Sequence, residues 1–373
     1  MTEVNHINIP QVNAGELTDT LCKLYLNAIK KGLPVSYVPS VFLSGAMGVG
    51  KSSSVFELGR RLEKATGKKV AVRDIRLMLM SPVDLLGLPV ANEDKTAARW
   101  ITPEMFIVDP SEDVINIIFL DELSNCPPAV QSAAYQIVLD RRVGGYSFPS
   151  NTVVIAAGNR LIDRSNVFKM PRALCNRLIH FEVTADYQSW RKWAFAHNIS
   201  SKVIGFLGFN NNLLMKPEYE TDDPAFPTPR SWEMVSKALM LFDDDESAAY
   251  SYICGCVGSG AAIEFNNYCK IYSLLPDVKS IFKGTAAPLA KKTSDIYSAL
   301  ICSMGAYAGN HTNDLPGIAR SITYASDNLP VDFATALIKD YLSISDDFRS
   351  ALIHMPEFKA FVLKKGVKLN GYI

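Results

Sequence analysis

Residues 45–52 read Gly-Ala-Met-Gly-Val-Gly-Lys-Ser, which fits the pattern G-x-x-x-x-G-K-S. Glycines at these positions let the backbone curl so that successive N–H groups point at one anion. In that geometry Lys51 reaches the outer phosphates of a nucleotide, and the Ser52 hydroxyl is a ligand for Mg²⁺. The pattern therefore predicts a phosphate-binding loop. We expect the nucleotide to contact Gly45, Ala46, Met47, Gly48, Val49, Gly50, Lys51, Ser52 and Ser53.

The residues on either side of the loop support the same prediction. The end of the preceding segment, residues 35–44, is apolar and predicts a buried strand. Residues 52–62 begin with small polar side chains and continue with helical spacing, which predicts a helix. A helix N-terminus places a positive dipole end beside a bound phosphate. Strand, glycine loop and helix thus follow one another in the order that such a site needs.

The composition is that of a globular chain with balanced charge. Of its 373 residues, 48% are hydrophobic, and 38 Lys and Arg residues match 38 Asp and Glu residues. A formal charge of zero gives no support for broad binding to nucleic acid or to a membrane surface. The seven cysteines form no C-x-x-C pair, which favours reduced, buried thiols. Because no apolar run reaches about 18 residues and no signal peptide begins the chain, we expect a cytoplasmic protein.

Apolar runs alternate with helical patterns in the first half of the chain. Near-continuous apolar strands separated by helices predict a parallel sheet that is covered on both faces. We therefore expect an α/β fold, a three-layer P-loop NTPase sandwich with a five-stranded parallel sheet. The five predicted strands are the end of 35–44, then 70–77, 114–121, 152–157 and 178–183.

After residue 185 the strand-like runs stop and helical periodicity dominates. An amphipathic helix is also predicted before the core, at residues 16–31. We expect an N-terminal helical lead (1–32), a P-loop ATPase core (33–185), an all-α lid (186–290) and a helical C-terminal extension (291–373). The pattern assigns no role to the extension.

A pair of acids follows the third predicted strand. Residues 117–120 are apolar, and Asp121 and Glu122 come directly after them, about 70 residues beyond the phosphate loop. At the carboxyl end of a buried strand, Asp121 would hold Mg²⁺ together with Ser52, and Glu122 would polarise the attacking water as the catalytic base. The alternative is an ordinary surface acidic pair after a core strand.

Four further polar residues complete the predicted site. The fourth strand ends at Asn159, whose amide would orient the lytic water beside Glu122. Before the fifth strand, Arg177 is the preferred arginine finger and Arg172 the second candidate; such an arginine reaches the nucleotide of a neighbouring subunit. Arg230 begins a helix of the lid and would contact phosphate within its own subunit.

In this order these elements resemble the AAA+ ATPases and, more closely, their MoxR-like and dynein-related branch. The resemblance covers roughly residues 30–265. Residues 81–87 look like that branch's segment after the second strand, and 120–133 are similar to its extended Asp-Glu motif. Many relatives carry Pro and Thr where this chain has Met47 and Val49, but these positions vary, so hydrolysis is still expected.

The resemblance implies a ring, usually of six subunits, with ATP at the interfaces and a chaperone-like motor that remodels a protein partner. Relatives often act with a protein carrying a von Willebrand factor A-like domain. Segments 84–100 and 140–150 correspond to inserted hairpins that face the pore or the partner. Trp100 and Tyr146 are candidate contact residues there, although packing in the core explains Trp100 at least as well.

Other functions stay open at the level of the sequence. The same fold serves motors directed to nucleic acid and clamp-loader-like switches, although the neutral charge argues against them. A scaffold that binds ATP without hydrolysing it is disfavoured by the Asp121–Glu122 pair. No residue reads the base, so GTP is an alternative to ATP. We expect a Mg²⁺-dependent ATPase that remodels or assembles a protein partner.

Overall fold

The computed structural model describes residues 9–163, 167–216 and 223–365. Its contacts divide the chain into two compact units, Met1–Ala185 (unit 1) and Asp186–Ile373 (unit 2), and each unit is described by itself. Among the helices of these described residues, none is both long enough and apolar enough to cross a bilayer.

Unit 1 is built on a parallel six-stranded sheet with the strand order β1-β10-β2-β9-β6-β3. Its central strands are apolar along nearly their whole length: residues 114–120 are all buried, and so are residues 152–158. Such strands need cover on both faces. The strands are β1 (Gln11–Asn13), β2 (Val41–Ser44), β3 (Lys69–Arg76), β6 (Val114–Asp121), β9 (Thr152–Gly158) and β10 (Ile179–Thr184).

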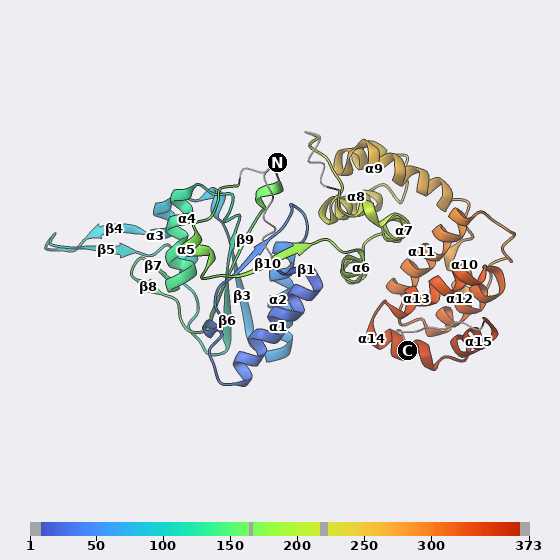
Figure 1. The fold of residues 1–373 in the computed structure, drawn as a ribbon, viewed down its shortest axis with the longest axis horizontal. Helices are drawn as coiled ribbons and strands as arrows, with labels where there is room; N and C mark the ends of the chain where they lie inside the picture. Colours follow the sequence, from blue (N-terminus) through green and yellow to red (C-terminus); the bar gives the residue numbers. More distant parts are fainter. Residues whose placement is uncertain (1–8, 164–166, 217–222, 366–373) are drawn as a thin grey trace, which may run out of the picture. The chain divides into compact units, whose positions relative to one another are not determined.

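Helices cover both faces of this sheet (Figure 1). Successive residues of β6 alternate between the two layers, as the strand period requires: Phe119 packs with α1 and α2, whereas Leu120 packs with α3, α4 and α5. The predicted three-layer α/β sandwich of a P-loop NTPase is therefore confirmed. The helices of unit 1 are α1 (Ala14–Lys30), α2 (Lys51–Thr66), α3 (Pro82–Leu86), α4 (Pro128–Tyr135) and α5 (Arg172–Cys175).

The sheet has one strand more than the sequence predicts. All five predicted strands are present, and β1 adds a sixth at the edge, where Gln11 pairs with Glu182 of β10. Only three residues long, β1 is too short to show a periodic pattern. It ends at Asn13, whose side chain accepts from the Glu16 N–H as the N-cap of α1. Because α1 begins directly after β1, the sequence pattern of this region indicates the helix and not the strand.

Both segments expected to carry inserted hairpins form antiparallel pairs. The β4–β5 hairpin projects away from the sheet (Figure 1). Trp100 on β5 is 44% exposed, so it is not a core residue. Tyr146 on β8 packs edge-on against Phe148, and its hydroxyl lies 3.3 Å from the backbone nitrogen of Val108. These strands are β4 (Leu88–Ala91), β5 (Ala98–Ile101), β7 (Arg142–Val143) and β8 (Tyr146–Ser147).

Unit 2 is helical wherever the structure describes regular elements in it. The acidic residues 243–246 lie in the loop after α8, and Pro356 starts the last helix directly after α14 has ended. The helices are α6 (Tyr187–Ala196), α7 (Ser201–Phe209), α8 (Pro229–Leu241), α9 (Tyr250–Tyr272), α10 (Val278–Lys283), α11 (Ser294–Asn310), α12 (Leu315–Asn328), α13 (Val331–Leu342), α14 (Asp346–His354) and α15 (Pro356–Lys365).

Helices α10 to α15 share one apolar core, with Met304, Ile322 and Leu337 among its fully buried members. An ion pair connects the first helix of unit 2 to this core. Arg191 of α6 makes two hydrogen bonds to the carboxylate of Asp340 on α13, one of them 2.7 Å long. The Arg191 guanidinium also lies over the ring of Phe195. The helices after residue 290 are thus fixed to the start of unit 2.

Candidate nucleotide-binding site

The predicted phosphate loop connects β2 to α2 at the carboxyl edge of the sheet. Gly48 and Gly50 adopt φ values of 74° and 104°, which favour glycine. A Cβ on Gly45 would lie 2.6 Å from the backbone oxygen of Val183, so no larger residue fits there. The loop therefore has the glycine-dependent turn that a phosphate cradle needs, and α2 begins directly after it at Lys51.

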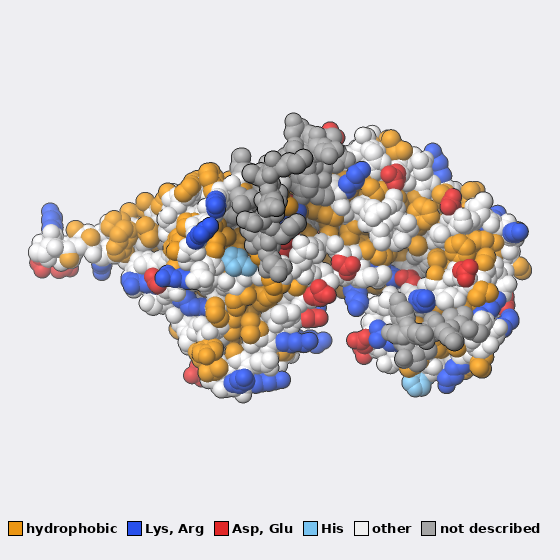
Figure 2. Space-filling model, in the orientation of Figure 1, with side chains coloured by type: hydrophobic (Ala, Val, Ile, Leu, Met, Phe, Trp, Pro, Cys, Tyr) orange, Lys and Arg blue, Asp and Glu red, His pale blue; other side chains and the backbone are white. Residues whose placement is uncertain are grey.

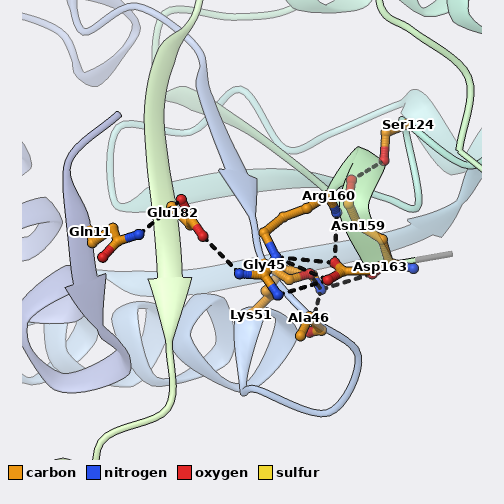
Figure 3. A network of polar contacts seen from close by, with 9 residues as sticks. All are labelled: Gln11, Gly45, Ala46, Lys51, Ser124, Asn159, Arg160, Asp163 and Glu182. Atoms are coloured by element: carbon orange, nitrogen blue, oxygen red, sulfur yellow. Dashed lines mark hydrogen bonds and ion pairs between the residues drawn. The ribbon is translucent and has the colours of Figure 1, made fainter. Parts of the chain in front are cut away.

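The Lys51 side chain is buried, with 9% of the residue exposed. Its ammonium donates to the backbone oxygens of Gly45 at 2.7 Å and Ala46 at 3.0 Å. It also donates to Asn159 Oδ1 at 3.0 Å (Figure 3). The phosphate loop and the tip of β9 therefore meet at one positive charge.

Ser52 and Asp121 lie together, as a metal site requires. The Ser52 hydroxyl donates to Asp121 Oδ2 at 2.9 Å, and Asp121 Oδ1 accepts from the Glu122 N–H at 2.9 Å. A hydroxyl and a carboxylate in contact at a phosphate loop are the oxygen ligands that suit Mg²⁺, whose other positions water and phosphate oxygens fill. With the glycine cradle and the Lys51 ammonium, this donor set fits a magnesium nucleotide.

Glu122 occupies a strained position directly after β6. Its φ of 63° lies in the left-handed region, which a residue with a Cβ rarely adopts. The backbone turns here, because the N–H groups of Asn125 and Cys126 both donate to the Glu122 oxygen. The Glu122 side chain is exposed. Strain of about 1–3 kcal/mol at an exposed acid beside Asp121 favours a functional role over chance.

The backbone of Asn159 is held from the neighbouring strand tip. The Ser124 hydroxyl donates to the Asn159 oxygen at 3.0 Å, and Asn125 Oδ1 accepts from the Asn159 N–H at 3.3 Å. A Cβ on Gly158 would collide with Ser124, so the close approach of the two tips depends on this glycine. Ser124 and Asn125 were not among the predicted site residues. The available signal was a pair of polar residues that follows the acidic pair after Leu123.

Arg160 is a third residue of the site that no sequence pattern indicates. Its guanidinium pairs with Asp163 at 2.7 Å and with Glu182 on β10 at 2.8 Å. Glu182 in turn accepts a hydrogen bond from Gln11 on β1 (Figure 3). A charged network therefore runs from the tip of β9 to the edge of the sheet.

Asp74 on β3 is a further acid near the predicted metal ligands. β3 pairs with β6 so that Arg76 lies opposite Asp121, two residues beyond Asp74. Partial burial and, to a smaller extent, the nearby Asp121 carboxylate raise the pKa of Asp74, and Arg76 opposes the rise. The carboxyl edge of β3 thus adds to the negative charge around Asp121.

The preferred finger arginine lies at the opposite edge of the sheet. Arg177 comes two residues before β10, whose Ile179 pairs with Val41, the first residue of β2. Arg177 is exposed and lines a small surface cavity of about 360 Å³ together with Ser40 and Arg141. Arg172, the first residue of α5, is also exposed. The length of β2 separates Arg177 from the phosphate loop of its own unit.

Arg230 is exposed in the first turn of α8 in unit 2. The start of that helix is fixed by Thr228, whose hydroxyl accepts from the Ser231 N–H at 3.0 Å. The position of Arg230 on its helix is therefore well defined by local capping.

Comparisons with known proteins relate part of the chain to a curated protein. No protein-family model matches the chain. The chain is 25% identical over 152 residues to Chaperone MoxR1 from Mycobacterium tuberculosis. The match takes in 40% of this chain and only 37% of the length of MoxR1. It confirms the resemblance to MoxR-like AAA+ ATPases that the order of the motifs indicates.

Two solved structures are similar over most of the chain at low identity. PCH-2 from C. elegans is 13% identical, with a TM-score of 0.33, over 79% of this chain and 68% of that one. A chain of the HORMA:CdnC:Trip13 complex from E. coli MS115-1 is 15% identical, with a TM-score of 0.35, over 68% of this chain and 86% of that one.

Proposed function

We propose that this protein is a Mg²⁺-dependent ATPase of the AAA+ type that works as a ring and remodels a protein partner. The observation that supports it most is the convergence of Lys51, Ser52, Asp121 and Asn159 at the carboxyl edge of the sheet. Two hydrogen bonds carry this convergence: Ser52 to Asp121 at 2.9 Å and Lys51 to Asn159 at 3.0 Å.

Each residue of this group has a role that its chemistry supports. The loop N–H groups and the Lys51 ammonium bind the β- and γ-phosphates, and Ser52 and Asp121 hold Mg²⁺. The metal ion, when bound, neutralises charge that develops on the phosphates. Glu122 accepts a proton from the attacking water, and the Asn159 amide orients that water. The intact pair of acids supports hydrolysis over a scaffold that only binds ATP.

The ring rests on the position of Arg177. An arginine at the edge opposite the phosphate loop cannot complete its own site, but it suits the site of an adjacent subunit in a ring, which we propose to be hexameric. A trans arginine contributes factors of about 10³ to 10⁵ to hydrolysis. We assign this role to Arg177 first and to Arg172 second. Arg230, in the lid of residues 186–290, contacts the phosphate of its own subunit. The position of the lid then depends on the bound nucleotide.

The proposed partner is a protein. The curated relative that the chain matches is named a chaperone. Figure 2 shows hydrophobic side chains gathered at the base of the β4–β5 hairpin, where Leu88, Trp100 and Ile101 are each more than 40% exposed. Such a patch suits a protein contact. We extend the proposal to a partner with a von Willebrand factor A-like domain.

The test is the ATPase rate against protein concentration, for the wild type and Arg177→Ala, with the assembly state followed in parallel. We expect a specific rate that rises with concentration, and a variant that assembles without hydrolysing ATP. A rate that is independent of concentration and untouched by the substitution would contradict the ring. A DNA-stimulated rate that falls steeply with salt would favour the nucleic-acid-directed motor instead.

A further inference from the structure

The pairing register of β9, β2 and β10 aligns the carboxyl ends of these strands at the edge of the sheet that carries the phosphate loop. Gly158 of β9 pairs with Ser44 of β2, and Ser44 pairs with Glu182 of β10. Gly45, the first residue of the phosphate loop, follows Ser44 directly. The tips of β9 and β10 are thus separated by the whole width of β2, or two strand spacings of about 4.8 Å each.

The Arg160 side chain spans this width (Figure 3). Its Nη1 atom donates to Glu182 Oε1 at 2.8 Å, so the guanidinium reaches over the end of β2, where the chain turns into the phosphate loop. On its other side the guanidinium donates to Asp163 through Nε at 3.0 Å and Nη2 at 2.7 Å. The Asp163 side chain is only 3% exposed, and this pairing neutralises it.

Asp163 also fixes the backbone next to Asn159. Its carboxylate accepts from the Arg160 N–H at 2.9 Å, and its own N–H donates to the Arg160 oxygen at 3.1 Å. Arg160 is therefore held by both its backbone and its side chain. Because Asn159 is the preceding residue, and Ser124 holds its carbonyl oxygen, its backbone is fixed on both sides, and its side-chain oxygen accepts from Lys51.

We propose that Arg160 is a positioning residue for hydrolysis: its ion pairs with Glu182 and Asp163 aim the Asn159 amide at the phosphate site. This inference rests on the proposed ATPase function. It also connects the site to β10, the last strand before unit 2 begins at Asp186.

The ion pair to Glu182 is not needed to hold the strands together. β2 already pairs with β9 on one side and with β10 on the other through backbone hydrogen bonds. The Arg160 side chain is 23% exposed and that of Glu182 is 17% exposed, and partly exposed pairs add little to stability. What the pair adds is a fixed direction for the strand tip, and misplacement of a catalytic group by about 1 Å lowers rates about 100-fold.

The experiment compares ATP binding with ATP turnover in Arg160→Ala, Arg160→Lys and Glu182→Gln. We expect the dissociation constant for ATP to change less than about threefold, while kcat falls about 10- to 100-fold in Arg160→Ala and Glu182→Gln. Arg160→Lys keeps one cation that can reach one of the two acids, so it recovers part of kcat. The double variant Arg160→Ala/Glu182→Gln is expected to be no slower than Arg160→Ala, because Arg160→Ala already removes the contact to Glu182.

Arg60→Ala is the matched control, since it removes an exposed arginine of the same unit that pairs with Glu57 of its own helix, α2. Its kcat is expected to equal that of the wild type. A wild type that binds and hydrolyses ATP while Arg160→Ala hydrolyses it equally fast would overturn the role of Arg160 alone. An equal fall of kcat and of the folded fraction in all three variants, with no recovery by lysine, would also overturn it. A wild type without ATP binding or turnover would overturn the proposed function, and this inference with it.

Discussion

The Lys51 ammonium donates a hydrogen bond to Asn159 Oδ1 at 3.0 Å, across 108 residues of sequence. This contact joins the first residue of α2 to the tip of β9. It places the amide at the point where the lysine meets the outer phosphates of a nucleotide. The same lysine also binds the Gly45 and Ala46 oxygens, so its direction is set by the loop that it serves.

Replacing Asn159 separates two effects at this contact. Asn159→Asp places a carboxylate beside the Lys51 ammonium, and opposite charges about 4 Å apart attract by about 4 kcal/mol at an effective dielectric constant of 20. The carboxylate therefore competes with phosphate, and we expect ATP binding to weaken by about tenfold or more. Asn159→Ala should keep ATP binding and lose hydrolysis. Titration calorimetry with a slowly hydrolysed ATP analogue measures the affinity of each variant. Equal affinities of the two variants would contradict the competition between the carboxylate and phosphate.

Glu122→Gln tests the assignment of the catalytic base. The amide is isosteric with the acid and keeps the backbone turn at φ 63°, but it accepts no proton from water. We expect ATP to bind as in the wild type and hydrolysis to fall about 10²- to 10⁴-fold. Single-turnover measurement of phosphate release gives the rate. Normal turnover in this variant would mean that another group is the base.

Ser52→Ala tests the metal site. It removes the hydroxyl that lies 2.9 Å from Asp121 and leaves the carboxylate in place. We expect the Mg²⁺ concentration for half-maximal hydrolysis to rise about tenfold, and chelation of Mg²⁺ to abolish hydrolysis in the wild type. Ser132→Ala is a suitable control, because that exposed hydroxyl donates to the Pro128 oxygen within α4. An unchanged magnesium dependence in Ser52→Ala would remove Ser52 from the metal site.

Gly158→Ala tests the close approach of the two strand tips. The added Cβ would lie 2.8 Å from the Ser124 Cβ and 2.9 Å from its backbone nitrogen, so the turn after β6 must shift. Overpacking of this kind costs about 1–3 kcal/mol, and the shift also displaces Asn159. We expect a lower Tm and slower hydrolysis. Gly145→Ala, where the added Cβ meets nothing within 4 Å, should change neither.

The sheet and the central residues of the candidate site could be predicted from the order of the strands and from the residues that follow them. Strands β2, β6 and β9 are mainly apolar, and β3 and β10 carry enough apolar residues among polar ones for a pattern to reveal them. Their parallel arrangement brings their carboxyl ends to one edge. Ser52, Asp121 and Asn159 could therefore be placed together without coordinates.

The remaining parts of the site depend on contacts that no local pattern encodes. Arg160 reaches Glu182 only because β2 lies between β9 and β10, and that order is a property of the folded sheet. The Ser124 hydroxyl donates to the Asn159 oxygen, and these residues are 35 positions apart in the sequence. The contact needs Gly158, because a Cβ there would collide with Ser124. β1 is too short for its alternation to be seen.

Asp340→Ala tests whether the C-terminal helices are part of unit 2. Arg191 on α6 is 2% exposed and both of its contacts to Asp340 would be lost, which leaves a buried charge without its partner. Breaking one side of a buried pair costs about 3–5 kcal/mol, a large fraction of the stability of a domain. We expect a clear fall in the unfolding midpoint, seen by calorimetry.

The control is Asp327→Ala, which removes an exposed ion pair with Lys364 between α12 and α15. Such pairs contribute about 0–1 kcal/mol, so its midpoint should stay close to that of the wild type. Arg191→Met/Asp340→Leu should recover stability, because replacing both charges by apolar side chains removes the uncompensated charge. If Asp340→Ala and Asp327→Ala unfold together at the wild-type midpoint, α13 does not hold α6, and the helices after residue 290 are an appendage of the lid.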